Sequence, residues 1–164
     1  MAKTAAVVTL SDKGSKGERE DLSGKFIVNH LKENGFEVVD YILLPDEFEE
    51  IKKALIDLSD NKKVNLIITT GGTGFSKRDV TPEATMAASE RNASGIAEAI
   101  RYNSLQITGR AMLSRGASVI RKDTVIVNLP GSLKAVKENL EYILPHIVHG
   151  IEILTNTTNE CGGQ

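Results

Sequence analysis

The feature that most constrains the fold is a glycine-rich segment, residues 69–84, which directly follows the apolar residues 64–68. A short apolar run rich in β-branched residues predicts a buried strand. Three glycines within four positions, Gly71, Gly72 and Gly74, indicate a backbone that must come close to another group. The segment therefore predicts a buried strand that ends in a glycine loop.

The same segment also contains a helix start, for which we expect Thr81 as the N-cap and Pro82 as the first helical residue. In an open α/β sheet such a junction lies at the carboxyl end of a strand, where ligands bind and backbone N–H groups suit anions. The loop is not a Walker A motif, because no Lys-Ser or Lys-Thr pair follows a final glycine, and Ser76 and Lys77 break a GxGxxG pattern. The sequence predicts a site for a phosphorylated ligand that uses neither motif.

Three further strands are predicted over residues 5–10, 36–44 and 124–129. Right-handed crossovers between parallel strands would bring their carboxyl ends to the same edge of the sheet as the glycine loop. One pocket built from four strand ends is therefore expected. The residues that follow these three strands are Ser11 and Asp12, then Asp46, then Pro130, Gly131 and Ser132.

Three acidic residues, Asp12, Asp46 and Asp79, are expected at this edge. Three carboxylates would repel a bound phosphate unless a divalent cation joined them. Mg²⁺ is commonly held by one or two carboxylates together with substrate phosphates. Phosphoryl or nucleotidyl transfer depends mainly on positioning and charge neutralisation, so it requires no protein nucleophile. The pattern favours a nucleotide bound with Mg²⁺.

Each acidic residue also has a purely structural interpretation. Ser11 and Asp12 could close a plain turn by satisfying local backbone N–H groups. Asp46 could cap the next helix, with a glutamate three positions later, in an arrangement worth about 1 kcal/mol. Asp79 could form a surface ion pair with Arg78 or occupy a turn. The residue pattern alone leaves these alternatives open.

The rest of the chain alternates predicted strands and helices. Apolar residues at spacings of three and four predict the helices, with Leu22 on the buried face of the first and two helices over residues 81–91 and 93–105. Residues 119–121 and 124–129 predict a tight hairpin, which adds an antiparallel pair. The expected fold is α/β, a three-layer α/β/α sandwich with a mostly parallel sheet and one antiparallel hairpin strand.

Length and composition limit the classes of protein to consider. We expect a single domain over residues 1–155, which buries roughly 70% of its unfolded surface, and a flexible tail over residues 156–164. The formal charge of -2 and the pI near 6.0 argue against nucleic acid as a partner. The start of the chain lacks the long apolar segment of a signal peptide or membrane span, so we expect no membrane partner.

The cysteine and histidine residues give little functional signal. Cys161 has no second cysteine to pair with, which fits a reducing compartment, and the expected location is cytoplasmic. His146 and His149 are three residues apart on the last predicted helix, but no nearby carboxylate or cysteine completes a zinc site.

The string from Thr69 to Ala84, with Arg78-Asp79 and Thr81-Pro82-Glu83 intact, resembles the signature of the molybdopterin-binding family, which includes the G domain of gephyrin. The likeness extends over most of the chain, through Ser11-Asp12, Leu44-Pro45-Asp46 and residues 128–132. The resemblance implies the family's fold and an enzyme of molybdenum cofactor biosynthesis. Such an enzyme transfers AMP from ATP to the terminal phosphate of molybdopterin, giving adenylylated molybdopterin and pyrophosphate, with Mg²⁺ as cofactor.

The resemblance also implies roles for individual residues. The two functional acids of the family match Asp46 and Asp79, as catalytic and Mg²⁺-binding residues. Ser114 and Arg115 would lie toward the pterin end of the substrate. The residues implied in contacting the nucleotide phosphates are Gly71, Gly72, Thr73 and Gly74. Ser11 and Asp12 would form the wall of the substrate and nucleotide pocket, and Pro130, Gly131 and Ser132 its floor.

The family leaves two further matters open. Its adenylyltransferase branch forms homotrimers and hands its product to a molybdenum-insertion protein, whereas a sister branch forms higher assemblies. The same glycine loop also occurs in family domains that are not adenylyltransferases, so the alternative is a non-catalytic pterin-binding or carrier protein. The presence of Asp12, Asp46 and Asp79 together favours the enzyme.

Overall fold

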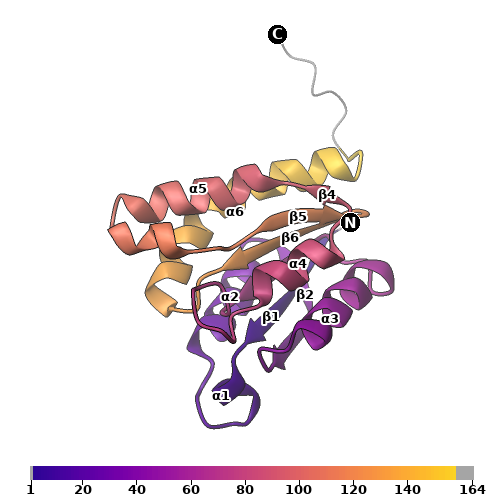
Figure 1. The fold of residues 1–164 in the computed structure, drawn as a ribbon. Helices are drawn as coiled ribbons and strands as arrows, with labels where there is room; N and C mark the ends of the chain where they lie inside the picture. The colour runs from indigo at the N-terminus through magenta and orange to yellow at the C-terminus, as the bar shows by residue number, and fades with distance from the viewer. Residues whose placement is uncertain (1, 158–164) are drawn as a thin grey trace.

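The computed structural model describes residues 2–157, which form a six-stranded sheet with helices on both faces (Figure 1). The expected three-layer sandwich is confirmed. The strands are β1 (Lys3–Leu10), β2 (Phe36–Leu44), β3 (Leu66–Thr70), β4 (Arg91–Asn92), β5 (Ser118–Arg121) and β6 (Thr124–Leu129). The helices are α1 (Asp12–Ser15), α2 (Leu22–Glu33), α3 (Phe48–Asp60), α4 (Thr81–Ala88), α5 (Ser94–Leu105), the 3-10 helix η1 (Gly109–Leu113) and α6 (Leu133–Leu154).

The order of the strands places the candidate site. The sheet runs β2-β1-β3-β6-β5-β4, with β1, β2, β3 and β6 parallel and β5 antiparallel to both of its neighbours. The predicted hairpin is confirmed, and Lys122 in its turn has a φ of 49°. Because β2 lies on one side of β1 and β3 on the other, the direction of strand addition reverses between β1 and β3. Ligands of open α/β sheets bind at the carboxyl ends of the strands at such a switch point.

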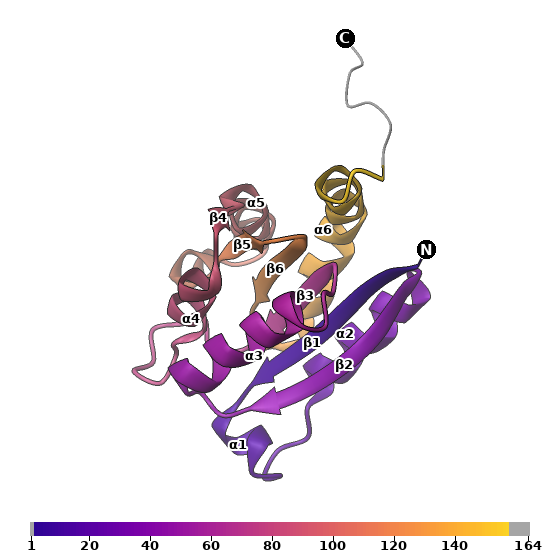
Figure 2. The same ribbon diagram turned by 90° about the vertical axis from the view of Figure 1, so that its right-hand side faces the viewer.

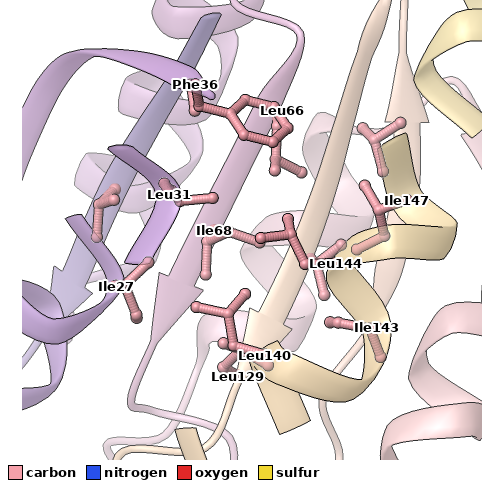
Figure 3. Packing of buried hydrophobic residues seen from close by; sticks show 14 of the residues in the cluster. Ile27, Leu31, Phe36, Leu66, Ile68, Leu129, Leu140, Ile143, Leu144 and Ile147 are labelled. Carbon is pink, nitrogen blue, oxygen red and sulfur yellow. The ribbon is translucent and has the colours of Figure 1, made fainter. Parts of the chain in front are cut away.

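The strands alternate their side chains between two apolar cores. One core lies under α2, α5 and α6, and the other lies under α3 and α4. The turned view shows α3 and α2 on opposite faces of the sheet (Figure 2). All residues of β3 and β6 are buried, as expected for strands that helices cover on both faces. The residues labelled in the larger core (Figure 3) are Ile27, Leu31, Phe36, Leu66, Ile68, Leu129, Leu140, Ile143, Leu144 and Ile147.

Two isoleucines of α6 give a matched test of this core. Ile147 is 3% exposed within the larger core, whereas Ile153 is 46% exposed. Ile147→Ala leaves a cavity, so we expect the free energy of unfolding to fall by about 2–5 kcal/mol. Ile153→Ala should change it by less than about 1 kcal/mol. Urea denaturation measures both values, and equal losses would contradict the packing described for Ile147.

Two expectations about helices are wrong in detail. The helix that begins at Thr81 ends at Ala88, not near Arg91. The backbone N–H of Glu90 donates to the carbonyl of Ile120 (3.0 Å), and the next two residues join the sheet as β4, so strand pairing overrides the helical pattern. Leu22, expected on the buried face of α2, is 53% exposed because it is the first residue of the helix and packs against neither apolar core.

The residues after α6 cap the helix, with Asn156 in the left-handed region at a φ of 54°. The backbone N–H of Thr157 donates to the carbonyl of Glu152 (2.9 Å). The rest of the predicted tail, residues 158–164 with Cys161, lies outside the described residues. Within residues 2–157, no helix is both long and apolar enough to cross a membrane.

Candidate functional site

A cleft of about 610 Å³ lies at the carboxyl ends of β1 and β3, where the strand order reverses. The segment after β6 and the first turn of α2 complete its wall. This is the edge of the sheet at which the sequence predicted a pocket. The predicted site residues that line the cleft are Ser11, Asp46, Gly71, Gly72, Asp79, Gly131 and Ser132.

Two glycines allow the loop after β3 to turn tightly. Gly71 and Gly72 have φ values of 96° and 67°. A Cβ at Gly71 would overlap the carbonyl oxygen of Leu10, and a Cβ at Gly72 would overlap the hydroxyl of Thr81. That hydroxyl donates a hydrogen bond to the carbonyl of Gly71 (3.0 Å). The N-cap of α4 is Val80, so the expected capping role of Thr81 is wrong, and its side chain instead holds the loop.

Asp79 closes the glycine loop from within. Its Oδ2 accepts hydrogen bonds from the backbone N–H groups of Gly74 (3.1 Å) and Ser76 (3.1 Å). The Asp79 residue also lines the cleft. The alternative of an ion pair between Arg78 and Asp79 is wrong, because Arg78 binds two other acids. Asp79 therefore serves as a turn residue and still presents a carboxylate to the cleft.

A reciprocal pair of hydrogen bonds joins the ends of β1 and β2. The N–H of Asp12 donates to Oδ2 of Asp46 (3.1 Å), and the N–H of Asp46 donates to Oδ1 of Asp12 (3.0 Å). The N-cap of α3 is Glu47, so the capping interpretation of Asp46 is wrong. Within residues 2–157, the buried Oδ1 of Asp46 has no hydrogen-bond partner.

Arg78 donates hydrogen bonds to both carboxylate oxygens of Asp12. Its Nε donates to Oδ2 of Asp12 and its Nη2 to Oδ1, each at 3.0 Å. The same Nη2 donates to Oε1 of Glu47 (2.8 Å). Both oxygens of Asp12 are therefore occupied, and two of the three predicted carboxylates, those of Asp46 and Asp79, line the cleft.

The pKa values of the two linked acids shift in opposite directions. The hydrogen bonds from Arg78 hold the pKa of Asp12 below its ordinary value, and the N–H of Asp46 lowers it further. Burial raises the pKa of the Asp46 carboxyl above its ordinary value. The charges of Asp12 and Asp79 add to this rise, and the N–H of Asp12 opposes it. An approaching cation would favour the ionised form of Asp46.

The raised pKa of Asp46 predicts a gain of stability on its substitution. The ionised carboxylate destabilises the fold at pH values above its folded pKa, and this cost disappears as the pH falls below the unfolded value of 3.8. We expect Asp46→Asn to raise the thermal midpoint at pH 7, and the gain to shrink at about pH 3.5. Asp123→Asn, in the exposed turn between β5 and β6, is the control. A midpoint for Asp46→Asn below that of the wild type at pH 7 would contradict this account.

Comparison with known proteins identifies the family of this chain. A family model described as "Probable molybdopterin binding domain" matches residues 6–149. The chain belongs to this molybdopterin-binding family. A molybdopterin adenylyltransferase of Helicobacter pylori is 39% identical over 150 residues, which cover 90% of this chain and 85% of the relative. Gephyrin of Dictyostelium discoideum is 43% identical over 160 residues, which cover 92% of this chain but 22% of gephyrin.

A solved structure of the molybdopterin-binding family has the same fold. It is the molybdopterin biosynthesis enzyme MoaB of Thermus thermophilus, with a TM-score of 0.87 and 42% identity. The match covers 95% of this chain and 98% of the MoaB chain. The resemblance carried by the glycine-loop signature is confirmed.

Mg²⁺, which the molybdopterin-binding family implies, fits the residues of the cleft. Within residues 2–157 the buried Oδ1 of Asp46 has no hydrogen-bond partner, and it lies beside Gly72 of the glycine loop, 3.0 Å from where a Cβ of that residue would stand. Asp79 contributes a second carboxylate to the same cleft. Among residues 2–157, no group of three or more His, Cys, Asp or Glu side chains is arranged to hold a metal ion. Two carboxylates suit Mg²⁺ when substrate phosphates supply further oxygens.

Arg115, which we expected toward the pterin end of the substrate, hydrogen-bonds to the glycine loop. Its Nε donates to the carbonyl of Gly74 (2.8 Å) and its Nη2 to the carbonyl of Asp79 (2.7 Å). Its backbone N–H donates to the carbonyl of Thr73 (2.8 Å), and its Nη1 pairs with Glu83. The guanidinium of Arg115 is thus committed to the loop that carries Asp79.

Ser114 and Pro130 line a second cavity of about 190 Å³. Arg101 and Arg110 contribute cationic side chains to this cavity. Pro130 faces the second cavity and Gly131 the main cleft, so the segment after β6 forms a wall between them. The structure therefore places Ser114 with Pro130 in the second cavity, apart from the predicted site residues that line the main cleft.

Sequence reasoning missed Arg78 and the α2 side of the cleft. Asp21 caps α2 by accepting the N–H of Gly24 (2.9 Å), and the Ser23 hydroxyl donates to the carbonyl of Gly131 (2.8 Å). Both Asp21 and Ser23 line the cleft. An aspartate before a helical pattern is an N-cap signal, so Asp21 was recognisable. The partners of Arg78 are 66 and 31 residues away along the chain, where no local pattern reveals them.

Proposed function

We propose that this chain is a molybdopterin adenylyltransferase of molybdenum cofactor biosynthesis. It transfers AMP from ATP to the terminal phosphate of molybdopterin and releases pyrophosphate. The observation that carries the proposal is the buried, unpartnered Oδ1 of Asp46, which borders the glycine loop at the switch point of the sheet. The relative of that name in H. pylori, which shares 39% of its residues over most of this chain, supports it.

The glycine loop and the N-terminus of α4 would bind the nucleotide phosphates. Backbone N–H groups at a helix N-terminus attract anions, and the tight turn at Gly71 and Gly72 brings the backbone of the loop to the cleft. Asp46 and Asp79 would hold Mg²⁺, which when bound neutralises charge on the phosphates. Arg115 would keep Asp79 in place through its bonds to the loop.

Two serines on the cleft wall have a donor left for the substrate. The Ser11 oxygen accepts the N–H of Gly14 (2.9 Å), and the Ser132 oxygen accepts the N–H of Ala135 (3.3 Å). Each hydroxyl proton therefore remains to donate to a phosphate oxygen. Asp12, whose two oxygens are occupied, would support Asp46 rather than bind the nucleotide.

The reaction needs no covalent intermediate on the protein. A terminal phosphate oxygen of molybdopterin attacks the α-phosphorus of ATP, and the bond from that phosphorus to the bridging β-oxygen breaks as pyrophosphate leaves. The chain contributes position and charge stabilisation. The second cavity, with Ser114, Arg101 and Arg110, would hold the pterin on the other side of the wall after β6.

A single-turnover assay with purified molybdopterin, ATP and Mg²⁺ tests this function. We expect pyrophosphate and adenylylated molybdopterin to form in equal amounts, and both to disappear when EDTA removes the metal. The alternative is a pterin-binding or carrier protein without transfer chemistry. Tight pterin binding with neither product would overturn the enzyme and establish that alternative.

The assembly and location are part of the same proposal. Tyr102, Leu105, Ile107, Met112 and Leu113, on α5, η1 and the segment between them, are each at least 41% exposed. Exposed apolar side chains of this kind support a protein interface. That the interface is that of a homotrimer, and that the protein is cytoplasmic, is carried over from the resemblance to the family. Sedimentation equilibrium measures the mass of the assembly.

Hand-over of the product to a molybdenum-insertion protein would follow, because the adenylylated pterin is an activated intermediate.

A further inference from the structure

Arg78 connects three segments around the cleft. It lies on the glycine loop, binds Asp12 after β1 through two hydrogen bonds of 3.0 Å, and binds Glu47 at the start of α3 at 2.8 Å. Asp12 in turn exchanges two backbone-to-carboxylate hydrogen bonds with Asp46. Arg78 therefore reaches the Asp46 carboxylate through one intermediate residue.

Arg78 makes three side-chain hydrogen bonds within the protein. Its Nε and Nη2 are used by Asp12 and Glu47, and Arg78 is not among the residues that line the cleft. A direct contact with a bound phosphate would have to use the N–H groups of Nη1, on a residue that does not line the cleft. The geometry favours an indirect role.

Asp12 would disturb the site if Arg78 were absent. Its carboxylate would be left as a third negative charge beside Asp46 and Asp79, and like charges near a phosphate weaken its binding. Its Oδ1 would also lose the bond that keeps it directed at the N–H of Asp46. A planar guanidinium can bind both oxygens of Asp12 at once, whereas an ammonium group acts as a point charge.

We propose that Arg78 is a positioning residue of the nucleotide site, which neutralises Asp12 and holds it in the orientation that fixes Asp46. The free Oδ1 of Asp46 then stays at the glycine loop, ready for a cation and its phosphates. This inference rests on the proposed function, because the ligand it concerns is Mg²⁺ with a nucleoside triphosphate.

A double-mutant cycle separates this indirect role from a direct one. The measurement is calorimetric binding of Mg²⁺ with α,β-methylene ATP to the wild type, Arg78→Gln, Asp12→Asn and the double variant. We expect Arg78→Gln to weaken binding about 10-fold. Adding Asp12→Asn should restore binding to within roughly threefold of the wild type, because the unpaired charge is gone and an amide oxygen still accepts the N–H of Asp46.

Two further variants serve as controls for charge, one that loses the same charge at a neighbouring residue and one that keeps the charge at position 78. Lys77→Gln removes a positive charge from the next residue, which is exposed, and should change the affinity less than roughly twofold. Arg78→Lys keeps the charge and should recover part of the loss. The proposal is overturned if Arg78→Gln binds like the wild type, or if the double variant binds no better than Arg78→Gln, which would assign Arg78 to the phosphates directly.

A measurement without nucleotide keeps the proposal separate from the proposed function. Amide hydrogen exchange of Asp12 and Asp46, followed by NMR, reports their reciprocal hydrogen bonds. Arg78→Gln should accelerate exchange at both amides at least roughly 10-fold, and Lys77→Gln should not. Unchanged exchange would overturn the positioning role. Failure of the wild type to bind the nucleotide, with accelerated exchange in Arg78→Gln, would overturn the function and leave the positioning of Asp46 standing.

Discussion

Asp79→Asn is expected to reduce AMP transfer about 100-fold or more, because charge stabilisation by a metal and its ligands is worth several kcal/mol. The loop itself should stay closed. An asparagine oxygen can still accept the N–H groups of Gly74 and Ser76, which now bind Oδ2 of Asp79. The substitution therefore removes the charge and keeps the geometry. Single-turnover rates, together with separate binding of ATP and molybdopterin, should show a fall in kcat with binding largely retained.

The control for this result is another aspartate at the opposite edge of the sheet. Asp123 is exposed in the turn that precedes β6, whereas the cleft lies after the end of β6. Asp123→Asn makes the same change of charge and should transfer AMP at the rate of the wild type. Full turnover by Asp79→Asn would remove Asp79 from the reaction and leave it as a turn residue alone.

Gly71→Ala is expected to lower the free energy of unfolding by about 2–5 kcal/mol, through two separate effects. Its φ of 96° lies in the left-handed region, which disfavours any side chain. A Cβ would also overlap the backbone carbonyl oxygen of Leu10, which pairing with β2 holds in the sheet and which cannot move aside as a side chain can. The strand ends on either side of the cleft would be forced apart, so activity should fall as well.

Gly35 separates the two effects. Its φ is 86°, close to that of Gly71, but no atom lies within 4 Å of a Cβ placed there. Gly35→Ala therefore tests backbone strain alone, and we expect a loss of about 1–2 kcal/mol. Urea denaturation measures both variants. If the two losses are equal, close packing against Leu10 does not contribute to the requirement for glycine at position 71.

Much of the fold follows from local sequence patterns. Residues 36–44 were predicted as a strand with the bounds that the structure shows, and the hairpin that leads into β6 was predicted from its two flanking runs. These predictions succeed because alternation and apolar runs report burial directly. The strand β4 was not predicted, because its two exposed residues gain their structure from pairing with β5.

The sequence by itself determined the architecture, the edge of the sheet where ligands bind, and the family to which the chain belongs. Tertiary structure alone decided which hydrogen-bond partners each of the three acidic residues has. Asp12 is neutralised by Arg78, 66 residues away, and Asp46 is oriented by Asp12 across 34 residues, so that one buried oxygen remains free. The physical reason is that strand and helix patterns depend on neighbours in the chain, whereas the charge and hydrogen bonding of a carboxylate depend on groups that only the folded sheet brings together.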